Sequence, residues 1–362
     1  MQSAAGGQHG TRGQMRTAAH PNMALMVDLV LHNGIAPMTG KRVGADTGDP
    51  RNFKSFEELW QAYRKQAEFL VPRMNVMLHV AQRVDEERIR YPVWSVLAPG
   101  CMEKGQDFLV GGMWSYKTWD WKDRAHVDAA DSLMAIKTLV FDQKNLTMAE
   151  LLETLDSNFA GERGEEIRQI CLAAPKFGNG IDEADKMVRE SGKMMGELIH
   201  RHKNPFGGPY SINRHGVSWH WYGGKGVGAL PDGRKAGEPL NDGSISPMRG
   251  MDRNGVTAVL RSVINAEFKE SRAAVLNQRF PATLMQSPEA MDKLANLTQT
   301  FLTSGGSHIQ YNILDHQKLL DAKKHPERYR DLVVRVAGYS AYWTHLTPEI
   351  QDDIIARTEQ VL

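Results

Sequence analysis

A short apolar strand that runs into a glycine near the C-terminus is the feature that most restricts how this chain can fold. The segment Asp331–Ala337 has the apolar character of a buried strand, and Gly338-Tyr-Ser-Ala341 comes directly after it. The glycine therefore lies where a buried strand turns into a tight loop. An arbitrary glycine at such a place supplies a positive φ angle or leaves room for a close approach of the backbone. The segment predicts a backbone constraint at Gly338.

Apolar spacing predicts two helical regions in the first quarter of the chain. Residues Met23 to Val30 have helical spacing that stops at Asn33-Gly34, which predicts a buried helix with a C-terminal cap. The amphipathic stretch Ser55–Tyr91 contains Pro72, and an interior proline removes a backbone hydrogen bond. We therefore expect a long pair of helices there, with a bend at the proline.

Capping sequences predict further helices. Asp128–Gln143 and Thr147–Asn158 have helical character, and Thr147-Met-Ala-Glu150 has the spacing of a capping box. Ser287-Pro288-Glu289 places an N-cap, a proline and an acid at the start of a helix that ends at Gly305-Gly306. Thr347-Pro348-Glu349 predicts the start of a last helix in the same way.

The region between these helices combines loops with strands. Pro205–Gly255 is dense in Gly, Pro and Asp and predicts loops. Ser307–Asp315 alternates polar and apolar residues with the two-residue period of a strand, and its polar face must meet other polar groups. A helix through Leu319 and Leu320 separates it from a second strand, Leu332–Ala337. This mixture predicts an α/β fold.

Composition excludes several classes of protein. Lys plus Arg number 44 against 43 Asp plus Glu, and no basic run could neutralise a series of phosphates, so we expect no nucleic-acid partner. Cys101 and Cys171 stand far apart, which predicts neither a disulfide framework nor a thiolate metal site. The longest apolar stretch near the N-terminus, Met23–Leu31, is too short to span a bilayer. We expect a cytoplasmic protein without signal peptide, anchor or metal site.

The string Arg335-Val-Ala-Gly-Tyr-Ser-Ala341, with Gln351-Asp-Asp-Ile-Ile-Ala-Arg-Thr-Glu359 after it, closely resembles the C-terminal signature of the pyruvate formate-lyase-like glycyl radical enzymes. Further segments resemble blocks of that family in the expected order. They are Asn33–Glu57, Ala130–Lys137, Ala174–Asn179, Gly228–Leu240 and Ile309–Asn312. The resemblance thus covers nearly the whole chain. It implies the C-terminal part of the family's ten-stranded β/α barrel with surrounding helices.

The resemblance makes Gly338 the residue that stores the radical. Removal of an α-hydrogen leaves a planar radical stabilised by the amide nitrogen and the carbonyl, and any side chain would obstruct that planarity. A buried site keeps such a radical from water and from oxygen, which would cleave the chain there. In this family a separate iron–sulfur enzyme that uses S-adenosylmethionine installs the radical. The resemblance therefore implies an activating enzyme as partner and no cofactor bound by this chain.

Gly100-Cys-Met-Glu103 imitates the loop that carries the family's thiyl-forming cysteine, but the residues after Glu103 resemble a different, later block of the family. We therefore expect the thiyl cysteine to be absent from this chain and to belong at or just before Met1. Cys171 has apolar neighbours in a predicted helix and is expected to be a core thiol. Arg12 and Arg16, shortly after the inferred cysteine position, are candidates for binding a substrate carboxylate. Their alternative role is that of solvated loop residues.

The favoured reaction is that of a radical carbon–carbon lyase, a fumarate-adding arylsuccinate or alkylsuccinate synthase, because Leu276–Pro281 and Ser307–Ile313 are similar to those enzymes. Tyr342-Trp343 departs from their Arg-Phe, so an arylacetate decarboxylase or a glycyl radical dehydratase stays as an alternative. A non-catalytic radical-bearing subunit or a repair module is an alternative of another class. We expect the chain by itself to be inactive without the cysteine loop.

The resemblance also predicts how the chain is organised. Residues 1–220 would belong to the barrel domain and residues 221–362 to the glycine radical domain. Expected partners are the activating enzyme and a small-molecule substrate, and the full-length protein would form a homodimer or a larger assembly. The enzyme class belongs to oxygen-sensitive, anaerobic metabolism.

Overall fold

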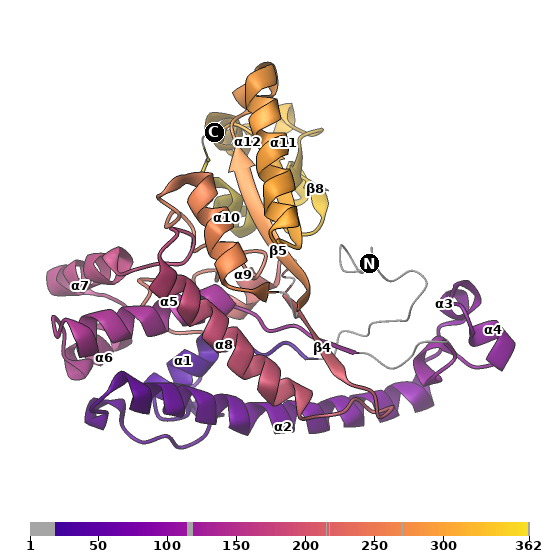
Figure 1. Ribbon diagram of the computed structural model, residues 1–362, viewed down its shortest axis with the longest axis horizontal. Helices are drawn as coiled ribbons and strands as arrows, with labels where there is room; N and C mark the ends of the chain where they lie inside the picture. Colours follow the sequence, from indigo (N-terminus) through magenta and orange to yellow (C-terminus); the bar gives the residue numbers. More distant parts are fainter. Residues whose placement is uncertain (1–18, 114–118, 215, 217, 269–270, 361–362) are drawn as a thin grey trace.

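The computed structural model describes residues 19–113, 119–214, 216, 218–268 and 271–360. A layer of helices forms the base of the molecule, and a parallel sheet with its own helices and the C-terminal segment stands on it (Figure 1). An arm at the end of the longest helix extends to one side (Figure 1). The predicted α/β character is confirmed by this combination of helices and a parallel sheet.

The helical layer is built around a helix that is buried on all sides. Every residue of α5 (His126–Ile136) is buried, and the chain continues from it as a π-helix over Lys137–Asp142. The other helices of the layer are α1 (Met23–Leu31), α2 (Phe56–Arg88), α6 (Met148–Asp156), α7 (Gly161–Ala173) and α8 (Asp182–His200). Helices α1 and α8 both pack against α5. The predicted helices at the start of the chain and at Thr147 are confirmed, and the Thr147 hydroxyl accepts from the Glu150 N–H at 3.1 Å.

The predicted pair of helices around Pro72 is wrong, because α2 is a single helix of 33 residues with the proline inside it. Proline removes one backbone donor and crowds the preceding turn. The Arg73 guanidinium donates to the Phe69 carbonyl at 2.7 Å in that turn. Leu59, Tyr63 and Val71 bury one face of α2 in the main core. This packing holds the helix continuous through a residue that by itself favours a break.

The sheet has four parallel strands in the order β3 (Trp119–Trp121), β4 (Tyr210–Arg214), β5 (Ser271–Phe280) and β6 (His308–Ile313). Strands β5 and β6 pair over six residues, with Asn277 opposite Gln310 and Arg279 opposite Asn312. Helices α10 (Gly255–Asn265) and α11 (Pro288–Thr303) pack with Ile309 and Tyr311 of β6 in the main core. The opposite face of these strands carries polar residues. The predicted strand at 307–315 and the predicted helix at 288 are confirmed.

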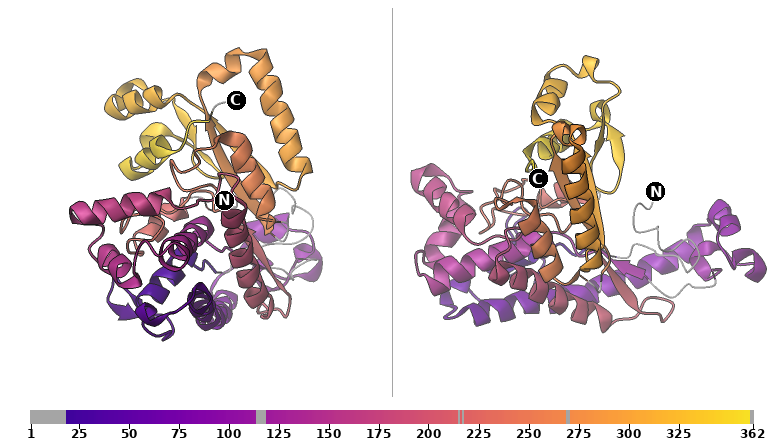
Figure 2. Two further views of the ribbon diagram at one scale, coloured as in Figure 1. Left: turned by 60° about the vertical axis from the view of Figure 1, so that its left-hand side comes forward. Right: turned by 45° about the horizontal axis from the view of Figure 1, so that its top comes forward.

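The C-terminal segment forms a unit with its own apolar cluster. It contains α12 (His316–Lys324), the antiparallel pair β7 (Val333–Arg335) and β8 (Ser340–Tyr342), and α13 (Pro348–Ala356). The buried Trp343 side chain lies in the cluster with Leu319, Val336 and Ile354. In Figure 2 this gold-to-yellow segment lies at the upper left of the left view and at the top of the right view, away from the indigo-to-purple helices at the bottom. Strand β7 is shorter than predicted, because Val336 and Ala337 already belong to the turn.

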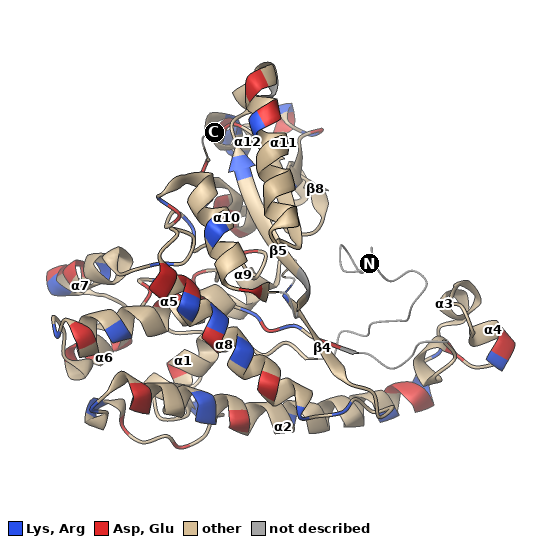
Figure 3. Cartoon of the chain, viewed as in Figure 1, with Lys and Arg blue, Asp and Glu red and all other residues tan. Residues whose placement is uncertain are grey.

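The remaining elements are short. Among the described residues they are β1 (Ile35–Ala36), β2 (Lys41–Arg42), α3 (Pro92–Leu97), α4 (Cys101–Lys104), α9 (Trp219–Gly224) and 3₁₀ turns at Pro50–Asn52, Phe108–Val110, Ala282–Gln286, Pro326–Arg328 and Trp343–His345. Helices α3 and α4 form the end of the arm (Figure 1). Within the described residues, no helix is both long and apolar enough to cross a bilayer. Acidic and basic residues are intermixed over the face seen in Figure 3.

Candidate functional site

The turn between β7 and β8 holds Gly338 in a conformation that favours glycine. Arg335 and Ser340 are paired across the hairpin, and the Val336 N–H donates to the Tyr339 carbonyl at 2.9 Å. Gly338 lies inside this turn with φ at +82°, and it is buried. A side chain at this φ would be strained. The backbone constraint predicted from the sequence is thus confirmed, and the turn places the glycine α-carbon inside the protein.

Strand β6 holds this turn with the polar face that its alternation predicted. The Gln310 side-chain oxygen accepts from the Gly338 N–H at 3.0 Å and from the Arg335 Nε at 3.0 Å. Asn312 binds the backbone of Arg335 twice, donating to its carbonyl at 2.5 Å and accepting from its N–H at 2.9 Å. Gln310 and Asn312 are both buried. These two side chains fasten the backbone of the hairpin to the sheet.

Strand β5 continues the same polar face and reaches the C-terminal segment. Asn277 donates to the Asp242 carboxylate at 2.6 Å. The Arg279 guanidinium donates to the carbonyls of Ile354 and Ile355, at 3.1 and 3.0 Å, where α13 ends. Cations near a helix C-terminus are stabilised by the free carbonyls there. The sheet therefore anchors both the glycine turn and the last helix of the chain.

A buried ion cluster lies behind the glycine turn. Arg357 donates to the Val336 carbonyl at 2.7 Å and pairs with Asp353 at 3.0 Å and with Asp242 at 3.2 Å. Asp353 also pairs with His220 at 3.0 Å and with Arg249 at 3.2 Å. These residues come from α9, from the loops after it and from the end of α13. The cluster joins three distant segments of the chain at one point.

The charges in this cluster stabilise each other. Burial alone would raise the pKa of Asp353, but His220 and Arg357 hold that pKa well below its usual range. Burial would lower the pKa of Arg357, but Asp242 and Asp353 raise it. A paired and hydrogen-bonded buried charge is stable, whereas removal of one partner leaves the other charge buried without compensation. Asp353 is thus ionised and Arg357 protonated in the folded protein.

A small polar cavity of about 20 Å³ lies beside the cluster, which is room for about one water molecule. Its lining includes Asp242, Asp252, Asn277, Arg279, Asn312 and Arg357. The Nε atoms of Arg279 and Arg357 and the side-chain oxygen of Asn277 have no hydrogen-bond partner among the described residues. Burial raises the pKa of Asp252 to about 6, against a hydrogen bond from Thr358. The cavity is a polar gap between the ion cluster and the sheet.

The other residues singled out in the sequence lie elsewhere. Arg12 and Arg16, the candidates for substrate binding, fall outside the described residues. Cys171 is fully buried in the main core, and burial raises its pKa to about 12, as expected of a core thiol. Cys101 begins α4 on the arm and packs in a separate small cluster with Phe108, Leu109 and Met113. In Figure 1 the arm with α4 lies far from β8, which ends the glycine hairpin.

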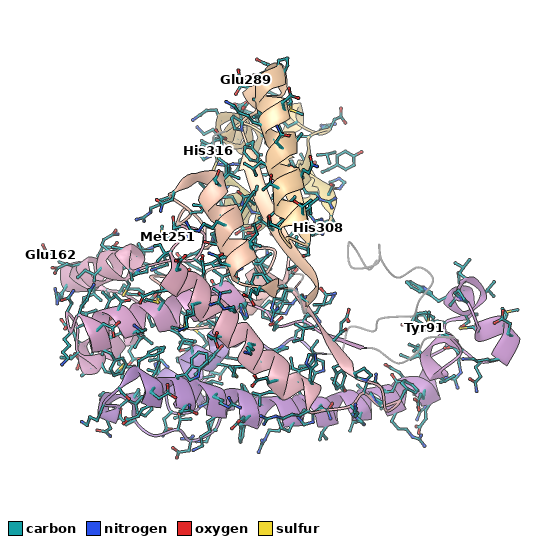
Figure 4. All side chains as sticks on the ribbon, in the orientation of Figure 1. Tyr91, Glu162, Met251, Glu289, His308 and His316 are labelled. Atoms are coloured by element: carbon teal, nitrogen blue, oxygen red, sulfur yellow. The ribbon has the colours of Figure 1, made fainter. Side chains whose placement is uncertain are left out.

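Within the described residues no group of three or more His, Cys, Asp or Glu side chains could hold a metal ion. Two histidines bind other protein groups: His79 contacts the Lys203 carbonyl at 3.1 Å, and His308 contacts the Gln310 side-chain nitrogen at 3.2 Å. In Figure 4, His308 lies near the lower end of α11, and Tyr91 lies on the arm.

Sequence reasoning missed most of the residues that hold the glycine turn. Gln310 and Asn312 were recognised as the polar side of a strand and as members of a segment that resembles a family block, but without a role. Asp353 and Arg357 were recognised only as part of a signature string. Arg249, His220 and Asp242 carried no local signal, because their partners are about a hundred or more residues away in the sequence. A buried polar strand face next to a glycine turn is the one signal that could have identified Gln310.

Residues 5–224 match the family model described as pyruvate formate lyase-like, and residues 241–344 match the model described as glycine radical. The trans-4-hydroxy-L-proline dehydratase of Clostridioides difficile is 37% identical over 339 residues, which is 94% of this chain and 43% of that protein. The isethionate sulfite-lyase of Oleidesulfovibrio alaskensis is 35% identical over 353 residues, 94% of this chain and 41% of that protein.

Among solved structures, the hydroxyproline dehydratase of Clostridioides difficile with trans-4-hydroxy-L-proline bound superposes with a TM-score of 0.92 at 36% identity. The match covers 97% of this chain and 44% of that one. The chain therefore spans less than half the length of the relatives it matches.

Proposed function

We propose that Gly338 stores a glycyl radical, and the premise is that this chain belongs to the pyruvate formate lyase-like glycyl radical enzymes. Its α/β fold is part of the β/α barrel of these enzymes, with surrounding helices. The division into a barrel domain over residues 1–220 and a glycine radical domain over residues 221–362 remains a prediction. So do the substrate-binding roles of Arg12 and Arg16.

One observation carries the proposal: a buried glycine with a positive φ lies in a turn whose backbone is bound on both sides. Gln310 binds the Gly338 N–H and Arg357 binds the Val336 carbonyl. A carbon radical between an amide nitrogen and a carbonyl needs a residue without a side chain and a place that excludes water and oxygen. Gly338 meets both needs.

Radical chemistry at this glycine requires two partners. A radical S-adenosylmethionine activating enzyme would remove the hydrogen from the Gly338 α-carbon. A cysteine on a loop opposite the turn would then give its hydrogen to the Gly338 α-carbon and become a thiyl radical, which would abstract a hydrogen atom from a substrate C–H bond. Neither described cysteine supports that role, since Cys101 lies on the arm and Cys171 in the core. We infer that another stretch of polypeptide, on the same chain or on a second subunit, supplies this cysteine.

For the reaction we propose radical elimination of the dehydratase type. This choice replaces the fumarate-adding synthase favoured by the sequence, because the similar proteins from Clostridioides difficile and Oleidesulfovibrio alaskensis are a dehydratase and a sulfite-lyase. Fumarate addition and arylacetate decarboxylation remain predictions. The residue two positions after the cysteine separates these reactions into two groups. A Glu there supports elimination or decarboxylation, and its absence supports fumarate addition.

Cleavage by oxygen tests the assignment of Gly338. The chain is activated anaerobically with an activating enzyme and then exposed to air, and its fragments are identified by mass spectrometry. Cleavage at residue 338 in the wild type, and none in the Gly338→Ala variant, is the expected result. Cleavage at another glycine, or equal cleavage in the variant, would place the radical elsewhere.

A further inference from the structure

We infer that Gln310 is a positioning residue that sets the Gly338 N–H for radical formation and storage. This inference rests on the proposed radical role of Gly338. Gln310 comes from β6, and its side chain is 6% exposed. Its oxygen lies 3.0 Å from the Gly338 nitrogen, which is a hydrogen bond of ordinary length to the atom next to the reacting carbon.

The orientation of the Gln310 amide is fixed by its neighbours. Two donors, the Gly338 N–H and the Arg335 Nε–H, point at the same atom, each at 3.0 Å. Only the oxygen of a glutamine side chain can accept, so that atom is the oxygen and the NH₂ group points away. The NH₂ group lies 3.2 Å from the His308 Nε2, and burial together with Arg335 lowers the pKa of His308. A neutral His308 can therefore accept from Gln310 and complete the arrangement.

Arg335 connects this contact to the other strand of the hairpin. Its guanidinium binds the Gln310 oxygen through Nε and the Ser340 hydroxyl through a terminal nitrogen at 3.2 Å. Its backbone is bound on both sides by Asn312. Residues 335 and 340 bracket the glycine, so these contacts define where its α-carbon lies. Displacement of a reacting group by about 1 Å is enough to lower a rate on the order of a hundredfold.

The bond to the N–H also acts on the radical itself. The unpaired electron on the glycine α-carbon is stabilised by donation from the amide nitrogen. An acceptor on the N–H increases the electron density of that nitrogen, and a fixed N–H direction keeps the amide plane in one orientation. Gln310 is therefore expected to affect both how readily the radical forms and how long it lasts.

Three variants of the whole chain separate positioning from folding. Gln310→Leu fills a similar volume but removes the acceptor. It leaves the buried Gly338 N–H without a partner and takes one acceptor from the half-buried Arg335 guanidinium. Gln310→Glu keeps an oxygen acceptor beside Arg335 and is the rescue variant. Tyr311→Phe, on the opposite face of the same strand, loses only a hydroxyl that contacts the Thr298 hydroxyl at 2.6 Å, and it is the matched control.

The first readout does not need the radical. Labelling alanine carbonyl carbons with ¹³C and glycine nitrogens with ¹⁵N selects Ala-Gly pairs, which occur four times in the sequence and include Ala337-Gly338. Solvent exchange of the Gly338 amide is then measured by NMR. Gln310→Leu should exchange about tenfold faster than the wild type, the factor that corresponds to about 1.4 kcal/mol. Gln310→Glu and Tyr311→Phe should stay close to the wild type.

The second readout is the half-life of the glycyl radical, measured by electron paramagnetic resonance after anaerobic activation. Gln310→Leu should shorten the half-life on the order of tenfold, with the wild-type value restored in Gln310→Glu. A wild-type chain without a radical overturns the proposed function and this inference with it. A wild-type radical whose half-life is unchanged in Gln310→Leu overturns the inference alone, whatever the amide exchange shows.

Discussion

Replacing Asp353 with Asn should release the segment that carries the glycine turn. Asp353 has no exposed surface, and one of its oxygens accepts from both His220 and Arg357, at 3.0 Å each, while the other accepts from Arg249 at 3.2 Å. An amide can place its single oxygen on only one side, and its NH₂ group then faces donors on the other. Arg357, which also binds the Val336 carbonyl beside Gly338, loses its closest carboxylate.

The size of the effect is set by the burial of the cluster. Removing one partner of a buried ion pair costs about 3–5 kcal/mol, since the remaining charge stays buried without compensation. That is a large part of the ~5–15 kcal/mol that stabilises a typical folded domain. Because the cluster links distant segments, we expect the loss to appear as local opening of the C-terminal unit before the helical layer unfolds.

Hydrogen–deuterium exchange measures this opening peptide by peptide. Amides in peptides covering residues 331–360 should exchange between about a hundredfold and a few thousandfold faster in Asp353→Asn, which corresponds to the expected ~3–5 kcal/mol. Peptides from α5 and α8 should change little. The neighbouring variant Asp352→Asn is the control, because Asp352 is 60% exposed and forms a surface ion pair with Lys323.

An exposed ion pair contributes under about 1 kcal/mol, so Asp352→Asn should leave the exchange of these peptides nearly unchanged. Equal, small effects of Asp353→Asn and Asp352→Asn would refute the reasoning, because the buried cluster would then not hold the segment. The pH dependence has a defined sign. The pKa of Asp353 is lowered on folding, so its contribution is present at neutral pH and disappears only as the pH falls below the usual range of a carboxylate.

Three further predictions concern single residues. Burial raises the pKa of Asp252 to about 6, so the folded state binds its proton more tightly, and the contribution of Asp252 to stability falls as the pH rises from about 4 to above 6. The free energy of unfolding should therefore fall more between about pH 4.5 and 7.5 in the wild type than in Asp252→Asn, and equal changes would contradict the prediction. Pro72→Ala should raise the free energy of unfolding by about 1–3 kcal/mol, since α2 is continuous there, and a loss in urea titrations would mean that the proline is needed. Trp343→Ala should lower stability by about 3–5 kcal/mol because this fully buried ring fills the C-terminal cluster, and a melting temperature equal to the wild type would show that the cluster is not a core.

Local signals allowed much of the helical architecture to be predicted. The start of α6 at Thr147 and that of α11 at Ser287 depend on side chains that cap their own helix, and both caps are formed. Strand β6 was predicted from the alternation of polar and apolar residues in its sequence. In the structure its apolar residues pack against the main core and its polar residues lie on the other face. Such features depend on neighbours a few residues apart, which sequence patterns record directly.

Long-range features escaped prediction for physical reasons. The sequence of strand β5 contains the apolar run Ala273–Leu276, but Asn277 and Arg279 on a buried polar face cut that run short, so the sequence pattern does not extend over the whole strand. The continuity of α2 through Pro72 depends on packing against the main core rather than on its own sequence. The ion cluster joins residues 220, 249, 353 and 357, and nothing in the local sequence of each indicates the others.

The central claim is that Gly338 carries the radical, and electron paramagnetic resonance tests it most directly. After anaerobic activation, the wild-type chain should show a doublet from the single hydrogen left on the glycine α-carbon, and glycine deuterated at that carbon should collapse the doublet to a single line. The Gly338→Ala variant should show neither signal. A doublet that persists in Gly338→Ala, or its absence from a wild-type chain that has been incubated with a competent activating enzyme, would contradict the account.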